Sequence, residues 1–148
     1  MMKKMNKKGF TLIELLAIIV ILAIIAVITV PLILGIIDEA REGADKSSVI
    51  GYGKAVELAY SKSGVSNEEP LSSCTATDGS CIAVSIDSVT KYFNVTYSGA
   101  QVVCSGNNEI SDGKLTLLSC VVGTDSNADT WTYDNGEASK DSAQSNNG

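Results

Sequence analysis

Residues 6–16 read NKKGFTLIELL, where lysines run into a glycine and a phenylalanine and a long apolar segment begins. From Leu15 to Ile37 there are 23 consecutive residues without a charged side chain. A bilayer core about 30 Å thick is spanned by about 20 apolar residues in a helix. The segment is longer than the apolar region of a secretory signal peptide, and no A-x-A-like cleavage site follows it. We therefore expect a membrane-spanning helix and not a buried helix of a soluble protein.

The distribution of charge predicts the orientation of this helix. Four lysines and no acidic residue precede the span, at positions 3, 4, 7 and 8. The positive-inside rule places this short N-terminus in the cytoplasm and the rest of the chain outside. Without these lysines the chain has seven basic residues against 17 acidic ones. Such an acidic external part argues against general nucleic-acid binding, which requires a basic patch.

Four cysteines lie in the external part, at Cys74, Cys81, Cys104 and Cys120. An even number in an exported region favours disulfides. The chain has no histidine and no C-x-x-C pair, so we expect no metal site and no cofactor. Three pairings are open. We favour Cys74–Cys81, which flank a tight turn, and Cys104–Cys120, which would face each other across a hairpin closed by a three-residue SDG loop.

Helical character is expected to continue beyond the apolar segment. Val49, Tyr52, Val56 and Tyr60 are spaced by three, four and four residues, which places them on one helical face. Pro31 has no amide hydrogen and predicts a kink. The glycines within the helix are either tolerated defects or points of flexibility and close packing. One helix is therefore expected from about residue 10 to about residue 62.

From residue 72 onward the sequence predicts strands. Short runs rich in Val, Thr, Tyr and Ile are separated by turn dipeptides such as Asp112-Gly113 and Asn135-Gly136. The expected strands are CIAVSI, NVTYSG, AQVVCS, KLTLLSCVV and TWTYD. DSVTKYF, residues 87–93, is expected to form a short helix capped by Asp87. The fold class is α+β: a long N-terminal helix, transmembrane and then amphipathic, followed by a small antiparallel β-sheet.

The stretch KKGFTLIELL and the apolar helix after it resemble the class III signal of type IV pilins and pseudopilins. In that resemblance Gly9 ends a basic leader and Phe10 becomes the new N-terminus. Glu14 is then the fifth residue of the mature chain. Pro31 falls where the family commonly has a proline in the membrane helix. The amphipathic continuation, the sheet and the late disulfide also resemble the family's lollipop-shaped subunit.

The resemblance implies how the chain is handled. A prepilin peptidase cuts between Gly9 and Phe10 and methylates the Phe10 amine. An assembly ATPase and a platform membrane protein then extract the subunit from the inner (cytoplasmic) membrane, where it is a single-pass protein with its N-terminus inside. Copies of the chain and related pilins form an extracellular pilus, with nucleic acid as a ligand only of a DNA-uptake pilus. The chain is a building block and not an enzyme.

The same resemblance divides the chain into five parts. These are a cleaved leader (1–9), a transmembrane and filament-core helix (10–37), its amphipathic continuation (38–63), a disulfide-bonded head (64–136) and a flexible polar tail (137–148).

Glu14 is a carboxylate about one turn inside an apolar span, where a charge is costly and indicates a function. We predict that it pairs with the Phe10 amine of a neighbouring subunit and so sets the axial register of the filament.

Three functions are weighed. A pilus subunit is favoured over a pseudopilin of a type II secretion or DNA-uptake system, which shares the N-terminus. A plain single-pass membrane protein would not explain GFTLIE. Asp125, Asn127 and Asp129 have the spacing of a calcium loop, and calcium binding by the head would favour a pseudopilin. However, Thr130 and Gly136 occupy the positions where that loop has its glycine and its last carboxylate. We therefore expect a polar loop there.

Overall fold

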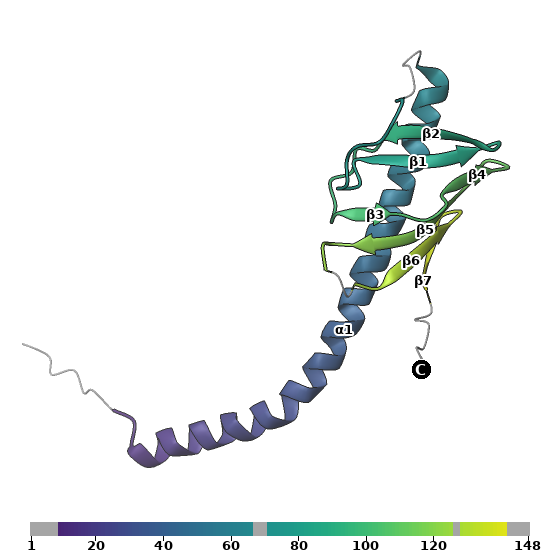
Figure 1. The fold of residues 1–148 in the computed structure, drawn as a ribbon. Coiled ribbons are helices and arrows are strands. Elements are labelled where there is room, and N and C mark those ends of the chain that lie inside the picture. The colour runs from purple at the N-terminus through teal and green to yellow at the C-terminus, as the bar shows by residue number, and fades with distance from the viewer. Residues whose placement is uncertain (1–8, 67–70, 126–127, 142–148) are drawn as a thin grey trace, which may run out of the picture. The chain divides into compact units, whose positions relative to one another are not determined.

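The computed structural model describes residues 9–66, 71–125 and 128–141. One helix, α1 (Leu12–Val65), is followed by seven strands, so the fold is α+β as predicted (Figure 1). The chain divides into two compact units, Met1–Arg41 and Glu42–Gly148, which are described separately. The strands are β1 (Cys81–Ile86), β2 (Val89–Asn94), β3 (Val102–Cys104), β4 (Glu109–Ser111), β5 (Lys114–Val122), β6 (Thr130–Asp134) and β7 (Glu137–Lys140).

In the first unit α1 has no buried side chain. The helix is continuous through Pro31, which has no amide hydrogen to donate to the carbonyl of Val27. A kink at this position stays a prediction.

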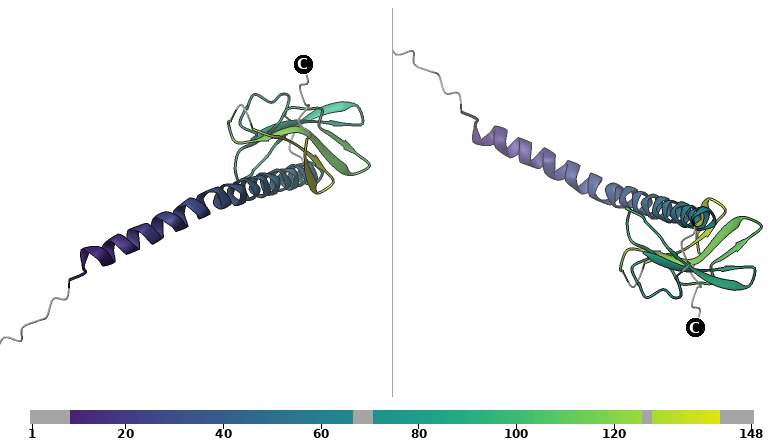
Figure 2. Two further views of the ribbon diagram at one scale, coloured as in Figure 1. Left: turned by 90° about the horizontal axis from the view of Figure 1, so that it is seen from below. Right: turned by 90° about the horizontal axis from the view of Figure 1, so that it is seen from above.

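In the second unit α1 lies along one face of the sheet (Figures 1 and 2). Val49, Tyr52 and Val56 are buried, which confirms the predicted face for these three residues. Tyr60, the fourth, is 38% exposed, and its ring meets that of Phe93 edge to face at a centroid distance of 6.1 Å. The amphipathic pattern therefore fixes which side of the helix meets the strands.

Gly53 allows α1 to approach the sheet closely. The ring of Tyr133 lies where a side chain at this position would begin, so any larger residue would overlap it. The hydroxyl of Tyr133 then reaches back to the helix and donates to Glu57 at 2.7 Å. Gly53 is thus a packing residue and not a tolerated defect.

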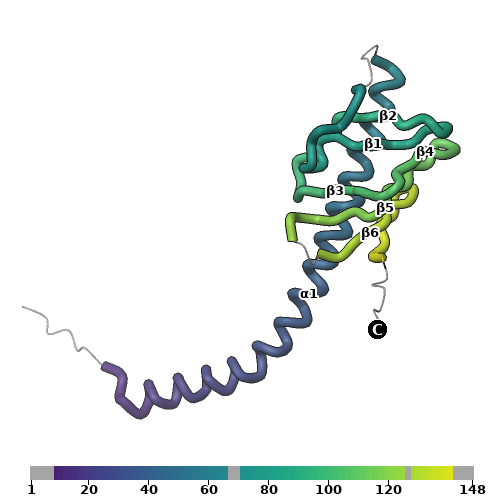
Figure 3. The backbone as a smooth tube through the Cα atoms, viewed as in Figure 1, coloured from purple at the N-terminus to yellow at the C-terminus, as the bar shows by residue number. Residues whose placement is uncertain are grey.

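The strands form one mixed sheet in the order β2-β1-β4-β5-β6-β7, with β3 pairing with β5 beside β4 (Figure 3). All pairs are antiparallel except β1 with β4, which is parallel over Ser85–Ile86. The expected purely antiparallel sheet is therefore wrong at this one junction. The core between helix and sheet consists of Val49, Tyr52, Val56, Ile82, Val84, Phe93, Val95, Val102, Ile110, Leu115, Leu117, Cys120, Trp131, Tyr133 and Ala138.

Two predictions between residues 87 and 99 are wrong. The expected helix over 87–93 is the strand β2, because Asp87 and Ser88 adopt positive φ angles of 49° and 68° and form a two-residue hairpin turn. Ile86 then pairs with Val89, and β2 folds back along β1. The expected strand NVTYSG is not formed either, since β2 ends at Asn94.

The cysteines pair as favoured from the sequence, Cys74 with Cys81 and Cys104 with Cys120. The expected hairpin around Cys104–Cys120 differs in two ways. Its turn is the two-residue Asp112-Gly113, with both φ angles positive, and not a three-residue SDG loop. The strand opposite β5 is also split into β3 and β4, whose registers differ by one residue.

The expected polar tail from residue 137 is wrong for its first four residues. They form β7, which pairs with β6 after a turn at Asn135-Gly136. Ala138 is the buried residue of this strand, so one small side chain supplies its contact with the core. Residues 142–148 lie outside the described part of the chain.

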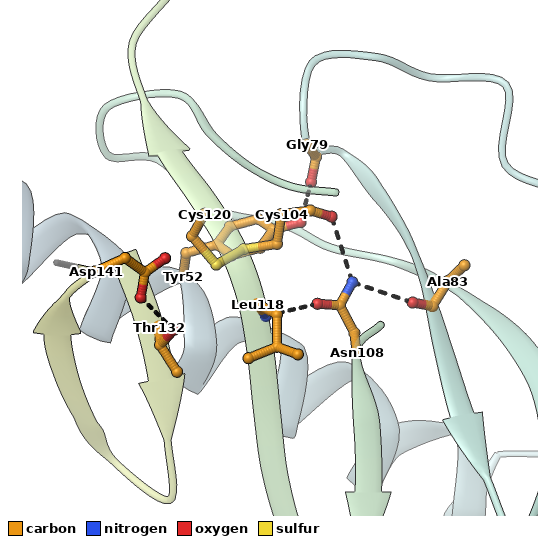
Figure 4. Close-up of a disulfide and its surroundings, with 9 residues drawn as sticks. All are labelled: Tyr52, Gly79, Ala83, Cys104, Asn108, Leu118, Cys120, Thr132 and Asp141. Atoms are coloured by element: carbon orange, nitrogen blue, oxygen red, sulfur yellow. Dashed lines mark hydrogen bonds between the residues drawn. A yellow bond between two sulfur atoms is a disulfide. The ribbon is translucent and has the colours of Figure 1, made fainter. Parts of the chain in front are cut away.

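Asn108 holds the sheet together where the ladder splits. Its side chain is buried and lies between three strands (Figure 4). Its amide nitrogen donates to the carbonyls of Ala83 and Cys104, both at 3.3 Å, and its amide oxygen accepts from the backbone of Leu118 at 3.0 Å. These bonds link β1, β3 and β5 at a place where β1 and β3 share no backbone pairing.

Replacing Asn108 should destabilise the head more than replacing another asparagine. Asn108→Ala leaves buried carbonyl and amide groups without their partner, at a cost of about 1–3 kcal/mol for each unsatisfied group. We expect the free energy of unfolding to fall by about 2–4 kcal/mol, measured by urea denaturation of the full chain in detergent micelles. The single tryptophan, Trp131, is buried and reports unfolding by fluorescence. Asn94→Ala is the matched exposed control, and an equal effect of both substitutions would contradict this role.

Stability at alkaline pH should depend on Tyr52. Its hydroxyl donates to the Gly79 carbonyl at 2.8 Å, and burial raises its pKa from 10.0 to about 12, with a smaller contribution from the Asp78 carboxylate. A raised pKa means that folding favours the protonated phenol. Its contribution is therefore complete below pH 10 and is lost as the pH rises through about 12.

In Tyr52→Phe the loss of stability between these two pH values should be smaller than in the unsubstituted chain, measured by denaturation at several pH values. Tyr60→Phe, at the more exposed end of the same helical face, is the control. Equal slopes of stability against pH in Tyr52→Phe and the unsubstituted chain would contradict the assignment.

Candidate assembly site

The first unit presents a continuous apolar surface. Every large apolar side chain from Phe10 to Ile37 is at least 41% exposed. This part of α1 is long and apolar enough to cross a membrane, with a mean hydropathy of 3.3 in its most apolar window. Side chains of this kind are unfavourable in water on all sides of a helix, so the surface needs lipid or other apolar helices around it.

The start of α1 is closed by two reciprocal hydrogen bonds between Thr11 and Glu14. The amide of Thr11 donates to the Glu14 carboxylate at 3.2 Å, and the amide of Glu14 donates to the Thr11 hydroxyl at 3.3 Å. This is a capping box, which satisfies two amide groups that a helix start otherwise leaves without a partner. A carboxylate in the first turn also interacts favourably with the helix dipole.

The capping role of Glu14 was not part of the sequence-based prediction. Its signal was present, because T-x-x-E before an apolar run is the pattern of a capping box. The structure therefore gives Glu14 a function within its own chain, in addition to the predicted pairing with another subunit.

Gly9 and Phe10 precede the helix and are both exposed. Phe10 is 84% exposed, and no atom lies within 4 Å of the position that a side chain at Gly9 would take. The peptide bond between them therefore lies in accessible, non-helical backbone. The four N-terminal lysines lie outside the described residues.

The second unit has an ion-pair network centred on Lys140. Its amine lies 2.8 Å from a carboxylate oxygen of Asp129 and 3.8 Å from one of Glu42. The hydrogen bond that the Lys140 amine donates to Asp129, and then the charges of Asp129, Glu42 and Asp45, raise the pKa of Lys140. The network ties β7 to the helix and to the loop before β6.

The calcium-like spacing gains no support from this geometry. The carboxylate of Asp129 is occupied by Lys140, and Asn127 lies outside the described residues. Within residues 9–66, 71–125 and 128–141 no group of three or more potential metal ligands comes together.

The comparisons with known proteins agree with the geometry of the N-terminus. Residues 4–30 match the family model of the prokaryotic N-terminal methylation motif. Neither the curated proteins nor the solved structures give a match. The motif indicates a type IV pilin-like or pseudopilin precursor, a structural protein. It implies processing by a prepilin peptidase and assembly into pilin-type filaments, and it fits membrane anchoring before assembly. The chain thus carries the class III signal peptide of type IV pilin-like proteins.

Proposed function

We propose that the chain is a structural subunit of a type IV pilus, cut between Gly9 and Phe10 and polymerised through its N-terminal helix. The observation that carries the proposal is the apolar first part of α1, which buries no side chain and which the methylation motif overlaps as far as residue 30. Lipid covers this surface first, and copies of the same helix cover it later. A contact between different surfaces of identical subunits that does not close into a ring gives an open helical fibre.

The parts of the chain follow from this function. Residues 1–9 are the leader, which is removed. Residues 10–37 form the membrane anchor and then the filament core, with Pro31 as a point where the helix can bend or repack. Residues 38–63 connect the core to the head, which extends from residue 64 through β7. The partners are copies of the chain, related pilins, a prepilin peptidase, an assembly ATPase and a platform membrane protein.

The location changes with assembly. The subunit begins as a single-pass protein of the cytoplasmic membrane with its N-terminus inside and ends in a pilus outside the cell. A pseudopilin would share every feature of the N-terminus, so the length of the filaments seen by electron microscopy distinguishes the two functions.

The capping box gives the Glu14 carboxylate a partner before assembly. In the precursor the carboxylate accepts from the Thr11 amide. After cleavage the chain gains a positive amine at Phe10, directly before Thr11. We propose that Glu14 pairs with the Phe10 amine of a neighbouring subunit, because an unpaired charge in an apolar core is costly.

Processing is tested by mass spectrometry of the subunit from sheared surface filaments. The mature chain should begin at Phe10 and carry an N-terminal methyl group. Gly9→Leu should block cleavage and leave the leader attached, because the branched side chain occupies the position next to the cleaved bond. Gly64→Leu, at a glycine whose side-chain position is equally open, is the control. Filaments built of a chain that still begins at Met1 would contradict the proposal.

The role of Glu14 is tested by two substitutions that separate its charge from its capping bond. Glutamine can serve in a capping box, so Glu14→Gln keeps the helix start and removes the charge. Glu14→Ala removes both. We expect both variants to be inserted and cut normally and to form few or no filaments by electron microscopy.

Thr11→Ala is the control for this test, because it removes one capping bond and leaves the charge. It should cost the helix about 1 kcal/mol and still give filaments. Normal filaments from Glu14→Gln would show that Glu14 serves only as a cap.

A further inference from the structure

A groove in the second unit lies between the last turns of α1 and the edge strand β2. Its volume is about 430 Å³. Leu58 and Leu71 line it and are 54% and 38% exposed, so it offers an apolar surface to a partner. Its charged groups are two exposed lysines, Lys62 and Lys91, and none of the described residues that line it is acidic. The described lining of the groove is therefore basic, on an acidic part of the chain.

The chain itself contains a segment of complementary chemistry. At the end of the apolar span, Ile36 and Ile37 are 61% and 41% exposed and are followed directly by Asp38 and Glu39, both exposed. The next acidic residue, Glu42, already forms an ion pair with Lys140. Residues 36–39 therefore combine exposed isoleucines with carboxylates that have no ion pair within the described residues.

The order of these residues along the helix sets a direction. Leu58 and Lys62 are four residues apart and share one side of α1, and Ile36 and Glu39 are three residues apart and do the same. When two copies lie parallel, the isoleucine meets the leucine and the carboxylate meets the lysine. An antiparallel copy would place the carboxylate on the leucine. Subunits that point the same way along a fibre are parallel.

We propose that the groove binds residues 36–39 of a second copy of this chain, parallel to the first. The stagger between the two copies is then about 33 Å, from 22 residues at 1.5 Å each. A contact between Glu14 and a neighbour's Phe10 amine requires an axial stagger of only about 6 Å, from four residues at 1.5 Å each. The two contacts therefore involve different neighbours. The inference rests on the proposed function and identifies how the head of one subunit holds the stem of another.

Photo-cross-linking tests which segment occupies the groove. Benzoylphenylalanine is placed at Leu58 of the full chain, filaments are assembled and irradiated, and the cross-linked peptides are identified by mass spectrometry. The expected product joins position 58 to the peptide of a second copy that contains residues 36–39. Val89, which is 57% exposed and does not line the groove, is the control position. Cross-links from position 58 to lipid, to another segment or to nothing would overturn the inference.

Charge reversal provides an independent test. Lys62→Glu with Lys91→Glu places like charges opposite Asp38 and Glu39 and should lower the mass of filaments about tenfold or more. Adding Asp38→Lys and Glu39→Lys to the same chain should restore the filaments. Lys114→Glu, at an exposed strand lysine away from the groove, is the matched control for Lys91→Glu. The fluorescence of Trp131 checks that each head is folded.

The outcomes separate this inference from the proposed function. If the unsubstituted chain forms no filaments, the proposed function fails and the groove contact fails with it. If the unsubstituted chain and the Lys114→Glu control form filaments and the reversed chain does so equally well, only the groove contact is overturned. Failure of the compensating substitutions to restore filaments would overturn it as well.

Discussion

The subunit depends on how the apolar surface of α1 is covered. Burying one leucine or isoleucine side chain stabilises a protein by about 1.5–3 kcal/mol, and a whole domain is stable by only about 5–15 kcal/mol. The exposed side chains from Phe10 to Ile37 thus represent more free energy than a small head can compensate in water. In the proposed function the first unit is consequently surrounded at every stage, by lipid before assembly and by like helices in the filament.

In the second unit the same helix packs against a sheet. Here α1 buries one face against the sheet and leaves the other in solvent, so its contacts with the strands are few and specific. Gly53 allows close approach to Tyr133, and the hydroxyl of Tyr52 is held by the Gly79 carbonyl. The sheet itself is small and splits between β1 and β3, where the side chain of Asn108 replaces backbone pairing. Two disulfides add stability to this small head.

The features that could be predicted from the sequence are those that depend on a local pattern of residues. The apolar span, the buried face at Val49 and Tyr52, and most strands follow from spacing alone. The helix wrongly expected over residues 87–93 shows the limit of local patterns. Val89, Tyr92 and Phe93 have helical spacing, and Asp87 fits a helix cap as well as a turn. The parallel pairing of β1 with β4 joins segments far apart in the chain, and no short pattern encodes it. The strand β7 follows β6 across the Asn135-Gly136 turn, so its signal was local and was missed because its residues are mostly polar. The capping box was local and could have been found.

The proposed cleavage changes what Glu14 is needed for. In the precursor its carboxylate accepts one backbone hydrogen bond, and bonds to charged groups are worth about 1.5–3 kcal/mol net. Removal of the leader places a cation at Phe10, at the end of the helix where the dipole is already positive and a cation is unfavourable. A pair of opposite charges adds their mutual attraction to the hydrogen bond, and this attraction is stronger in an apolar core than in water. In the proposed assembly, exchanging the cap for a neighbour's amine is therefore favourable only after the cut, so the same cut that removes the leader also favours polymerisation.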